Sequence, residues 1–237
     1  MNLAIDIGNT SVKWATFEGT TLKDSGRWKS GTGKWKGVGM AAICASGDTA
    51  KVVGALEAAG IPHILIDNTT PLPIELDYRT PATLGPDRIA AACGAWGIHP
   101  GEASIVIDAG TCITVDYLDE GGVYHGGAIM PGIAMSLGAL HRDTAKLPLV
   151  DPDGYVTAHI PGRTTEESII AGTLGATMLA LAGYVTLYRQ RVPQLHVMLT
   201  GGDAARLTAA GVSGWEHVEN LTLRGINEIL KTQNLKR

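Results

Sequence analysis

Two short acidic turns stand out because each places a carboxylate, a glycine and a hydroxyl group directly after an apolar run. The first is the DIGNTSVK segment that begins at Asp6. The second is the DAGT segment that begins at Asp108, near the middle of the 237-residue chain. Main-chain N–H groups of such turns can bind phosphate oxygens, and a carboxylate can hold a hydrated cation. A single copy could be an ordinary hairpin turn, but two copies at this spacing predict a duplicated domain whose two turns bind one phosphate chain.

The first turn contains the groups that are needed to bind a nucleoside triphosphate. Asp6 is expected to hold hydrated Mg²⁺, and Gly8 permits the chain to reverse. The main-chain N–H groups of residues 9–11 can point at phosphate oxygens, and Lys13 can reach the transferred phosphate as a point charge. In the second half of the chain, residues 108–111 are expected to contact the same phosphates or a second cation.

A second group of polar residues lies between Tyr78 and Arg88, and Asp87 and Arg88 are adjacent at an expected helix start. In one interpretation Asp87 caps the helix and Arg88 is a surface residue, an arrangement that contributes about 1 kcal/mol to stability. In the other, Asp87 is a base and Arg88 binds an anion, so that the pair handles a small acidic substrate with a hydroxyl group. Both interpretations are open from these residues alone.

The hydrophobic pattern indicates the same order of elements in both halves, a three-stranded meander followed by alternating helices and strands. In the first half we expect strands at 3–6, 11–17, 20–29, 40–45 and 62–67, helices at 49–59 and 87–96, and a loop at 68–86. In the second half we expect strands at 104–108, 112–118, 123–129 and 195–199, and helices at 133–142, 165–190, from 203 onward and at 221–230. This order predicts an α/β protein with two domains, 1–102 and 103–237. Each domain would be a mixed sheet with an antiparallel meander, flanked by helices.

Composition and charge limit the class of function. Of the residues, 45% are hydrophobic and 18% are charged, which is typical of a globular protein. The net charge of −4 argues against binding to nucleic acid. The N-terminus lacks a basic signal region, so we expect a cytoplasmic protein. Cys44, Cys93 and Cys112 form no CxxC pair, and we expect buried free thiols. The uncharged stretch 168–188 could span a membrane by length, but its threonines and glycines favour a buried or interface helix without membrane contact.

As a set, these segments resemble the motifs of the type III pantothenate kinases, a family in the superfamily of actin, sugar kinases and heat-shock ATPases. The resemblance covers nearly the whole chain. DIGNTSVK and DAGT are similar to the two phosphate motifs of the family, and Tyr78 with Gly85-Pro86-Asp87-Arg88 is similar to its pantothenate motif. Residues 162–165 are similar to a later pantothenate contact, and residues 199–203 to the adenosine segment. One departure is Pro86, where the family usually has Ala.

The resemblance implies two duplicated ribonuclease H-like domains, the actin-like ATPase fold. It also implies transfer of the γ-phosphate of ATP to pantothenate, the first step of coenzyme A biosynthesis, with Asp87 as the catalytic base. The residues that it implies for pantothenate binding are Tyr78, Gly85, Pro86, Asp87, Arg88 and Thr165. The residues that it implies for ATP binding are Asp6, Ile7, Gly8, Asn9, Thr10, Ser11, Val12, Lys13 and Thr111. Asp6 would hold Mg²⁺ through water, and Asp108 would hold K⁺ or NH₄⁺.

The resemblance further implies a homodimer in which the substrate pocket is completed across the interface. Thr165 begins the long uncharged helix, which fits a buried seam between subunits. Two other functions are considered: a kinase for a different small hydroxy acid, and a non-catalytic nucleotide-binding scaffold or transcription accessory factor of the same superfamily. The pantothenate motif argues against the first, and the presence of Asp87 argues against the second.

Overall fold

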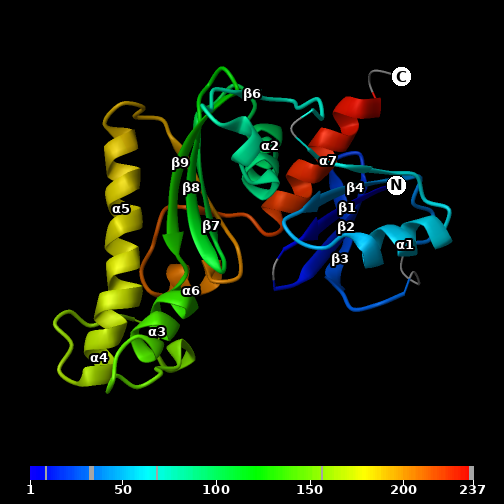
Figure 1. Ribbon diagram of the computed structural model, residues 1–237. Coiled ribbons are helices and arrows are strands. Elements are labelled where there is room, and N and C mark those ends of the chain that lie inside the picture. Colours follow the sequence, from blue (N-terminus) through cyan, green and yellow to red (C-terminus); the bar gives the residue numbers. More distant parts are fainter. Residues whose placement is uncertain (9, 32–34, 68, 156, 235–237) are drawn as a thin grey trace. The chain divides into compact units, whose positions relative to one another are not determined.

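The chain forms two compact units (Figure 1). The computed structural model describes residues 1–8, 10–31, 35–67, 69–155 and 157–234. Unit 1 comprises Met1–Glu102, Leu118–Gly126 and Asn220–Arg237, and unit 2 comprises Ala103–Tyr117 and Gly127–Glu219. Unit 1 therefore takes up two segments that follow residue 103 in the chain. The division into duplicated domains at 1–102 and 103–237 stays a prediction.

Unit 1 is built on a five-stranded mixed sheet with the order β3-β2-β1-β4-β5. Its strands are β1 (Asn2–Ile7), β2 (Val12–Glu18), β3 (Thr21–Trp28), β4 (Met40–Ala45) and β5 (His63–Leu65). The first three strands form the predicted antiparallel meander. In contrast, β4 runs parallel to β1, and β5 runs parallel to β4. This pairing brings the carboxyl ends of β1 and β4 side by side, directly before the first acidic turn.

Side chains that alternate along these strands build one core on each face of the sheet. The helices of this unit are α1 (Ala50–Ala58), α2 (Pro86–Ile98) and α7 (Leu221–Asn234). Leu3 and Ile5 of β1 belong to the core that contains Leu56 of α1. Ala4, between them in the sequence, belongs to the core that contains Ile89 of α2 and residues of α7. Both faces of β1 are therefore buried, which explains why the strand before Asp6 is continuously apolar.

Helices α2 and α7 lie side by side in unit 1 and approach closely at two glycines (Figure 1). A Cβ atom on Gly94 would lie 2.5 Å from the carbonyl oxygen of Leu221. A Cβ atom on Gly225 would collide with the carbonyl oxygen of Ala90. The absence of a side chain at these positions allows the two helix backbones to pack directly on each other and fixes the position of α2.

The second sheet has six strands in the order β11-β10-β7-β8-β9-β6. They are β6 (Glu75–Leu76), β7 (Ser104–Ala109), β8 (Cys112–Leu118), β9 (Val123–Pro131), β10 (His196–Thr200) and β11 (Glu216–His217). Strands β7, β8 and β9 are neighbours in chain order, as β1, β2 and β3 are in the first sheet. β10 runs parallel to β7, and β11 parallel to β10. β6 pairs with Val123 and Tyr124 of β9, which lie in unit 1 as it does.

The helices of unit 2 are α3 (Ile133–Arg142), α4 (Thr165–Ile170), α5 (Ala176–Arg189) and α6 (Ala204–Ala209). A π-helical turn, Ala171–Gly175, joins α4 to α5 without a break. Buried residues of these helices, such as Leu137, Leu181 and Leu207, share one core with Ile105 and Ile107 of β7. The stretch Thr165–Arg189 has the length and composition of a membrane-spanning helix, with a mean hydropathy of 1.6. Of its most apolar window, 44% is buried inside the protein.

The predicted fold class, α/β with mixed sheets flanked by helices, is confirmed, and the corrections concern short elements. The expected loop 68–86 contains β6 and a 3-10 turn at Pro81–Thr83. The helix expected from Asp87 begins one residue earlier, at Pro86. The two-residue strand β11 was not predicted, because so short a segment has no detectable hydrophobic period.

Candidate active site

The first acidic turn closes the β1–β2 hairpin of unit 1. The Gly8 N–H donates a hydrogen bond to the Ser11 carbonyl oxygen (3.1 Å), and the Ser46 N–H donates to the Ile7 carbonyl oxygen (2.8 Å). The segment that follows β4 is therefore fastened to the turn. Thr10 is exposed, whereas Asn9 lies outside the described residues.

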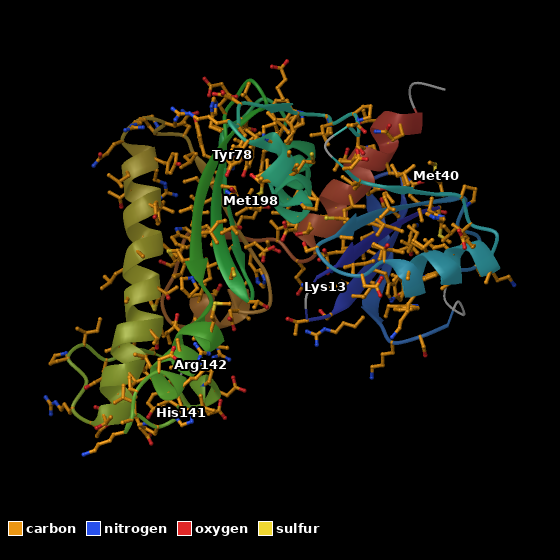
Figure 2. All side chains as sticks on the ribbon, in the orientation of Figure 1. Lys13, Met40, Tyr78, His141, Arg142 and Met198 are labelled. Carbon is orange, nitrogen blue, oxygen red and sulfur yellow. The ribbon has the colours of Figure 1, made fainter. Side chains whose placement is uncertain are left out.

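Two charged residues flank this turn as a cross-strand pair. Asp6 of β1 lies directly opposite Lys13 of β2, and Ile7 lies opposite Val12. Directly opposite residues of an antiparallel pair have their side chains on the same face of the sheet. A carboxylate and an ammonium group, both half-buried, therefore project from one face at the end of the hairpin; Figure 2 labels Lys13 there.

The buried thiol of Cys44 is subject to the negative charges of two carboxylates, those of Asp6 and Asp87. Burial raises the pKa of Cys44 well above its ordinary value, and the negative charges of Asp6 and Asp87 raise it further. Cys44 is the parallel-strand partner of Asp6 and is completely buried. Cys44 also belongs to the core that contains Ile89 of α2, so the helix that carries Asp87 in its first turn packs against this part of the sheet. Unit 1 thus brings together two acidic residues that are far apart in the sequence.

Asp87 lies in the first turn of α2, next to the residues that begin this helix. Gly85 is the N-cap and Pro86 the first helical residue, a position that suits the fixed φ of proline. The Arg88 N–H donates to Asp87 Oδ1 (2.9 Å), and a Cβ on Gly85 would lie only 2.5 Å from that oxygen. The Arg88 side chain is 8% exposed. Both parts of the capping interpretation are therefore wrong, since Gly85 caps the helix and Arg88 is buried.

Tyr78 is held against strand β9. Its ring lies 6.1 Å from that of the fully buried Tyr124, measured between ring centroids. The Tyr78 ring also lies close to Gly126 of the same strand, where an added Cβ would be 2.9 Å from Tyr78 Cε2. The φ of +87° at Gly126 also disfavours any residue with a side chain. Figure 2 labels Tyr78 beside this strand. Tyr78, Asp87 and Arg88 all belong to unit 1.

The second acidic turn, in unit 2, is built around three glycines. The Gly110 N–H donates to the Cys112 carbonyl oxygen, and the Gly132 N–H, at the start of α3, donates to the Thr111 carbonyl oxygen, both at 3.0 Å. Gly201 follows β10 with a φ of +98°, and a Cβ there would lie 2.5 Å from Asp108 Oδ1. The turn that carries Asp108 and Thr111 therefore packs against the ends of two other elements.

Two further predicted segments also lie in unit 2. Thr165 is the exposed first residue of α4, and the Thr164 hydroxyl caps this helix by accepting from the Glu167 N–H (3.1 Å). Asp203 occupies the N-cap position of α6, after β10. Burial raises the pKa of Asp203 despite the opposing charge of Arg206.

Comparison with known proteins identifies the family of this chain. Residues 37–187 match the family model described as type III pantothenate kinase. A relative named type III pantothenate kinase from Bacteroides fragilis is 37% identical over 250 residues, which cover 99% of each protein. The chain belongs to the type III pantothenate kinase family. It is therefore a kinase, as the paired acidic turns predict.

Solved structures confirm the fold of this type III family member. A Baf family protein from Campylobacter jejuni, described as a transcriptional activator, has a TM-score of 0.65 at 19% identity and covers 98% of this chain and 99% of its own. A glucokinase from an Antarctic psychrotroph has a TM-score of 0.51 at 13% identity and covers 98% of both chains. At these identities the likeness shows the fold alone, which is that of the actin-like ATPases and sugar kinases.

Two features of this kinase were not anticipated from its sequence. Cys44 and Cys93 are buried as expected, but Cys112, at the start of β8, is exposed. Sequence reasoning also missed His125, which lies between the carboxylates of Asp77 and Asp119. A lone histidine in an alternating strand gives no signal of this contact, because Asp77 is brought to it only by the short strand β6.

Proposed function

We propose that this protein transfers the γ-phosphate of ATP to the primary hydroxyl group of pantothenate, the first step of coenzyme A biosynthesis, with Asp87 as catalytic base. The observation that carries this assignment is the packing of α2, with Asp87 in its first turn, into the same core as Cys44, the strand partner of Asp6. In this proposal the first acidic turn binds the triphosphate, and the start of α2 presents the base. Family membership supports both substrates, since the relatives are named pantothenate kinases.

In the proposed reaction, the pantothenate hydroxyl oxygen forms a bond to the γ-phosphorus. The bond from that phosphorus to the oxygen bridging the β- and γ-phosphates breaks, so ADP leaves with the electron pair. Asp87 accepts the hydroxyl proton late in this step, because phosphoryl transfer passes through a loose transition state. The main contribution of the protein is to align hydroxyl and phosphate and to balance charge. Lys13, opposite Asp6, supplies a positive charge that suits the transferred phosphate.

The pantothenate contacts are assigned to residues around the start of α2 and to Thr165. Arg88 binds the anionic or amide end of pantothenate, and its burial supports a role other than a surface charge. Gly85 and Pro86 form the start of the helix that carries Asp87, and Tyr78 provides a ring from the same unit. Thr165 is also assigned to pantothenate, through its hydroxyl group. ATP is assigned to Asp6, Ile7, Gly8, Asn9, Thr10, Ser11, Val12, Lys13 and Thr111.

Two cations complete the proposal. Asp6, a half-buried carboxylate at the hairpin end, suits hydrated Mg²⁺, which would offset the charge of the triphosphate. Asp108 is assigned to K⁺ or NH₄⁺. In support of this assignment, Asp108 Oδ1 and the Ala109 carbonyl oxygen both lie close to the place that a Cβ on Gly201 would take, so two oxygen atoms approach the same point.

A homodimer is also part of the proposal. Helix α5 presents Leu179 and Leu187, which are 66% and 60% exposed, on a stretch free of charged residues between Ser168 and Tyr188. Exposed leucines on an uncharged helix are typical of a face that another subunit covers. We further propose that the substrate pocket is completed across this interface. The three free cysteines support a reducing compartment, the cytoplasm.

A phosphorylation assay tests the function. Purified protein is incubated with ATP and Mg²⁺ in sodium, potassium or ammonium buffer, and ADP release is measured with pantothenate and with a panel of other small hydroxy acids. We expect turnover with pantothenate that depends on potassium or ammonium. A preference for another hydroxy acid would contradict the substrate, whereas full activity in sodium alone would contradict only the cation assigned to Asp108.

A further inference from the structure

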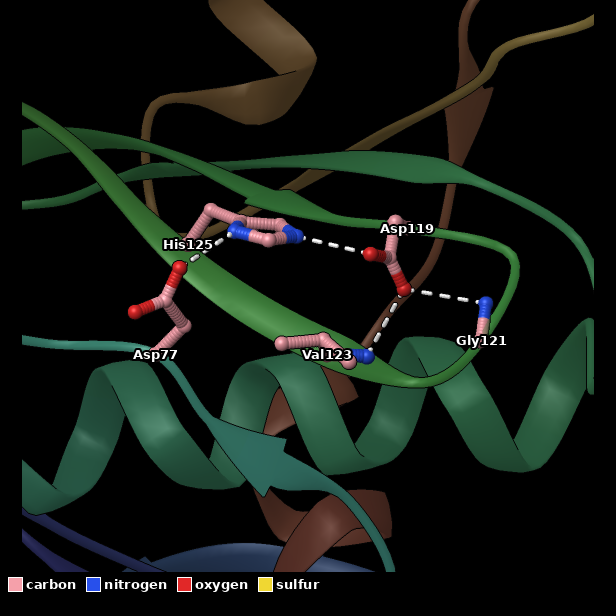
Figure 3. Close-up of polar contacts among 5 residues, drawn as sticks. All are labelled: Asp77, Asp119, Gly121, Val123 and His125. Atoms are coloured by element: carbon pink, nitrogen blue, oxygen red, sulfur yellow. Dashed lines mark hydrogen bonds and ion pairs between the residues drawn. The ribbon is translucent and has the colours of Figure 1, made fainter.

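His125 of β9 lies between two carboxylates, one at each ring nitrogen (Figure 3). Its Nδ1 is 3.2 Å from Asp77 Oδ2, and its Nε2 is 2.7 Å from Asp119 Oδ2. Asp77 follows β6, whereas Asp119 belongs to the turn after β8. The other oxygen of Asp119 accepts the N–H groups of Gly121 and Val123, each at 2.9 Å, so this carboxylate is fixed by its own turn.

The two contacts of His125 can be favourable at the same time only when the ring is protonated. A neutral imidazole has one N–H donor and one lone pair, whereas the imidazolium donates from both nitrogens. With a neutral ring that donates to Asp119, a lone pair at Nδ1 would face the Asp77 carboxylate. The hydrogen bond with Asp119 raises the pKa of His125, and Asp77 adds to this rise against the opposing effect of burial. Burial raises the pKa of Asp119, but the hydrogen bonds from His125, Val123 and Gly121 and the charge of His125 together lower it below its ordinary value.

The His125 contact fastens the segment that carries Tyr78. The Asp77 N–H donates to the Tyr124 carbonyl oxygen (2.9 Å), and the Asp77 side chain reaches His125 one residue further along β9. Tyr78 directly follows Asp77, and its ring packs on Tyr124 and Gly126, the neighbours of His125 in the strand. Release of the Asp77 side chain would remove one of the attachments that set the position of this ring.

We propose that His125 is a positioning residue for pantothenate: in its protonated form it holds Asp77, and thereby Tyr78, in the geometry that binds the substrate. This inference rests on the pantothenate-binding role proposed for Tyr78. It makes the affinity for pantothenate, rather than the rate of phosphoryl transfer, depend on the protonation of a residue that touches neither substrate.

The sign of the pH dependence follows from the direction of the His125 shift. The folded protein raises the pKa of His125 above its ordinary value of 6.5. The contact with Asp77 is therefore complete below pH 6.5 and is lost as the pH rises through the raised pKa. The KM for pantothenate should increase over that range. Because Asp77 is largely exposed, we expect an increase of about two- to fivefold, the effect of a surface ion pair.

Two variants separate positioning from a general structural role. In Asp77→Asn, the amide can donate to neutral Nδ1 or accept from its N–H, so the contact persists at both extremes of pH. In His125→Gln, the double contact is absent at every pH. We expect the pantothenate KM to rise with pH in the wild type, to stay low and flat in Asp77→Asn, and to stay high and flat in His125→Gln. The pH profile of kcat should be common to all three proteins.

A wild-type KM that is constant from pH 6 to pH 9 would overturn the proposal, as would an Asp77→Asn variant with the same rise as the wild type. A second measurement needs no activity. In proton NMR, the Tyr78 ring signals, assigned with Tyr78→Phe, should shift with the same midpoint as the His125 ring, and Asp77→Asn should abolish this coupling. Independent titration of the two rings would refute the proposal even in an active kinase. Coupled rings in a protein that does not phosphorylate pantothenate would instead refute the proposed function alone.

Discussion

Asp6 and Lys13 are cross-strand partners in the β1–β2 hairpin, one on each side of the turn that reverses the chain. Since opposite residues share a face of the sheet, the register alone places an anionic and a cationic group together at the hairpin end. A shift of one residue in the pairing would move them to opposite faces. The burial of β1 on both sides secures this register, so the core of unit 1 and the proposed phosphate site depend on the same strand.

Replacement of Lys13 by Met should impair the use of ATP. The substitution keeps an unbranched side chain but removes the charge proposed for the transferred phosphate, so we expect turnover to fall by about 10²-fold or more, as for removal of one stabilising group from a transition state. Steady-state kinetics with varied ATP measure the effect. Lys23→Met is the matched control, because Lys23 lies on the neighbouring strand β3 and pairs with Glu18 at the surface. Equal activities of the two variants would contradict the role of Lys13.

Asp87→Asn should retain binding of both substrates and lose catalysis. The amide has nearly the same shape as the carboxylate, but it cannot accept the hydroxyl proton. We expect kcat to fall by about 10²- to 10⁴-fold, the usual contribution of a general base. Calorimetric titration with pantothenate and with ATP checks that binding survives. Near-normal turnover in this variant would remove Asp87 from its assigned role.

The contact between α2 and α7 predicts a large difference between two glycine-to-alanine substitutions. In Gly225→Ala, the new Cβ would collide with the Ala90 carbonyl oxygen, and the helices would have to separate. We expect the free energy of unfolding to fall by roughly 1–3 kcal/mol or more, as in overpacked cores. In Gly54→Ala, the Cβ on α1 would meet no atom within 4 Å, so a gain of up to about 1 kcal/mol from helix propensity is expected. Urea denaturation distinguishes the two, and similar stabilities would show that the helices are less tightly packed than described.

The exposed leucines of α5 predict how the proposed dimer can be disrupted. In Leu179→Glu, a charge would be buried in the subunit interface without a partner, which is strongly unfavourable. We expect this variant to be monomeric by light scattering coupled to size exclusion, and to have lost activity if the interface completes the substrate pocket. Leu65→Glu, on β5 of unit 1, serves as the control, because Leu65 is also exposed, at 47%. A monomeric wild type would refute the dimer, and a fully active Leu179→Glu monomer would refute only the shared pocket.

The sequence predicted the long elements and the acidic turns well, because their signals are local. The apolar run before Asp6 and its repetition before Asp108 identify two buried strands, each followed by a phosphate-type turn. In the same way, the apolar spacing of 133–142 marks α3 without error. Such patterns follow from burial of one or both faces, and the sequence contains them directly.

What could not be predicted depends on contacts between distant segments. The burial of Arg88 follows from the packing of α2, and no local feature separates a buried arginine from a surface one. The Asp77–His125 contact requires β6 to pair with β9, across nearly fifty residues of chain. Cys112 was expected to be buried because its neighbours are apolar, but it is exposed where β8 begins.

The π-helical turn between α4 and α5 has a consequence for how this helix tolerates change in length. One extra residue in a turn rotates all that follows by about 100° relative to an uninterrupted α-helix. The inward direction of Leu181 and the outward direction of Leu179 therefore depend on Ala171–Gly175 retaining its full length. Loss of a single residue there would turn a different row of side chains toward the core and another toward the face proposed for the dimer, without altering any residue of either row.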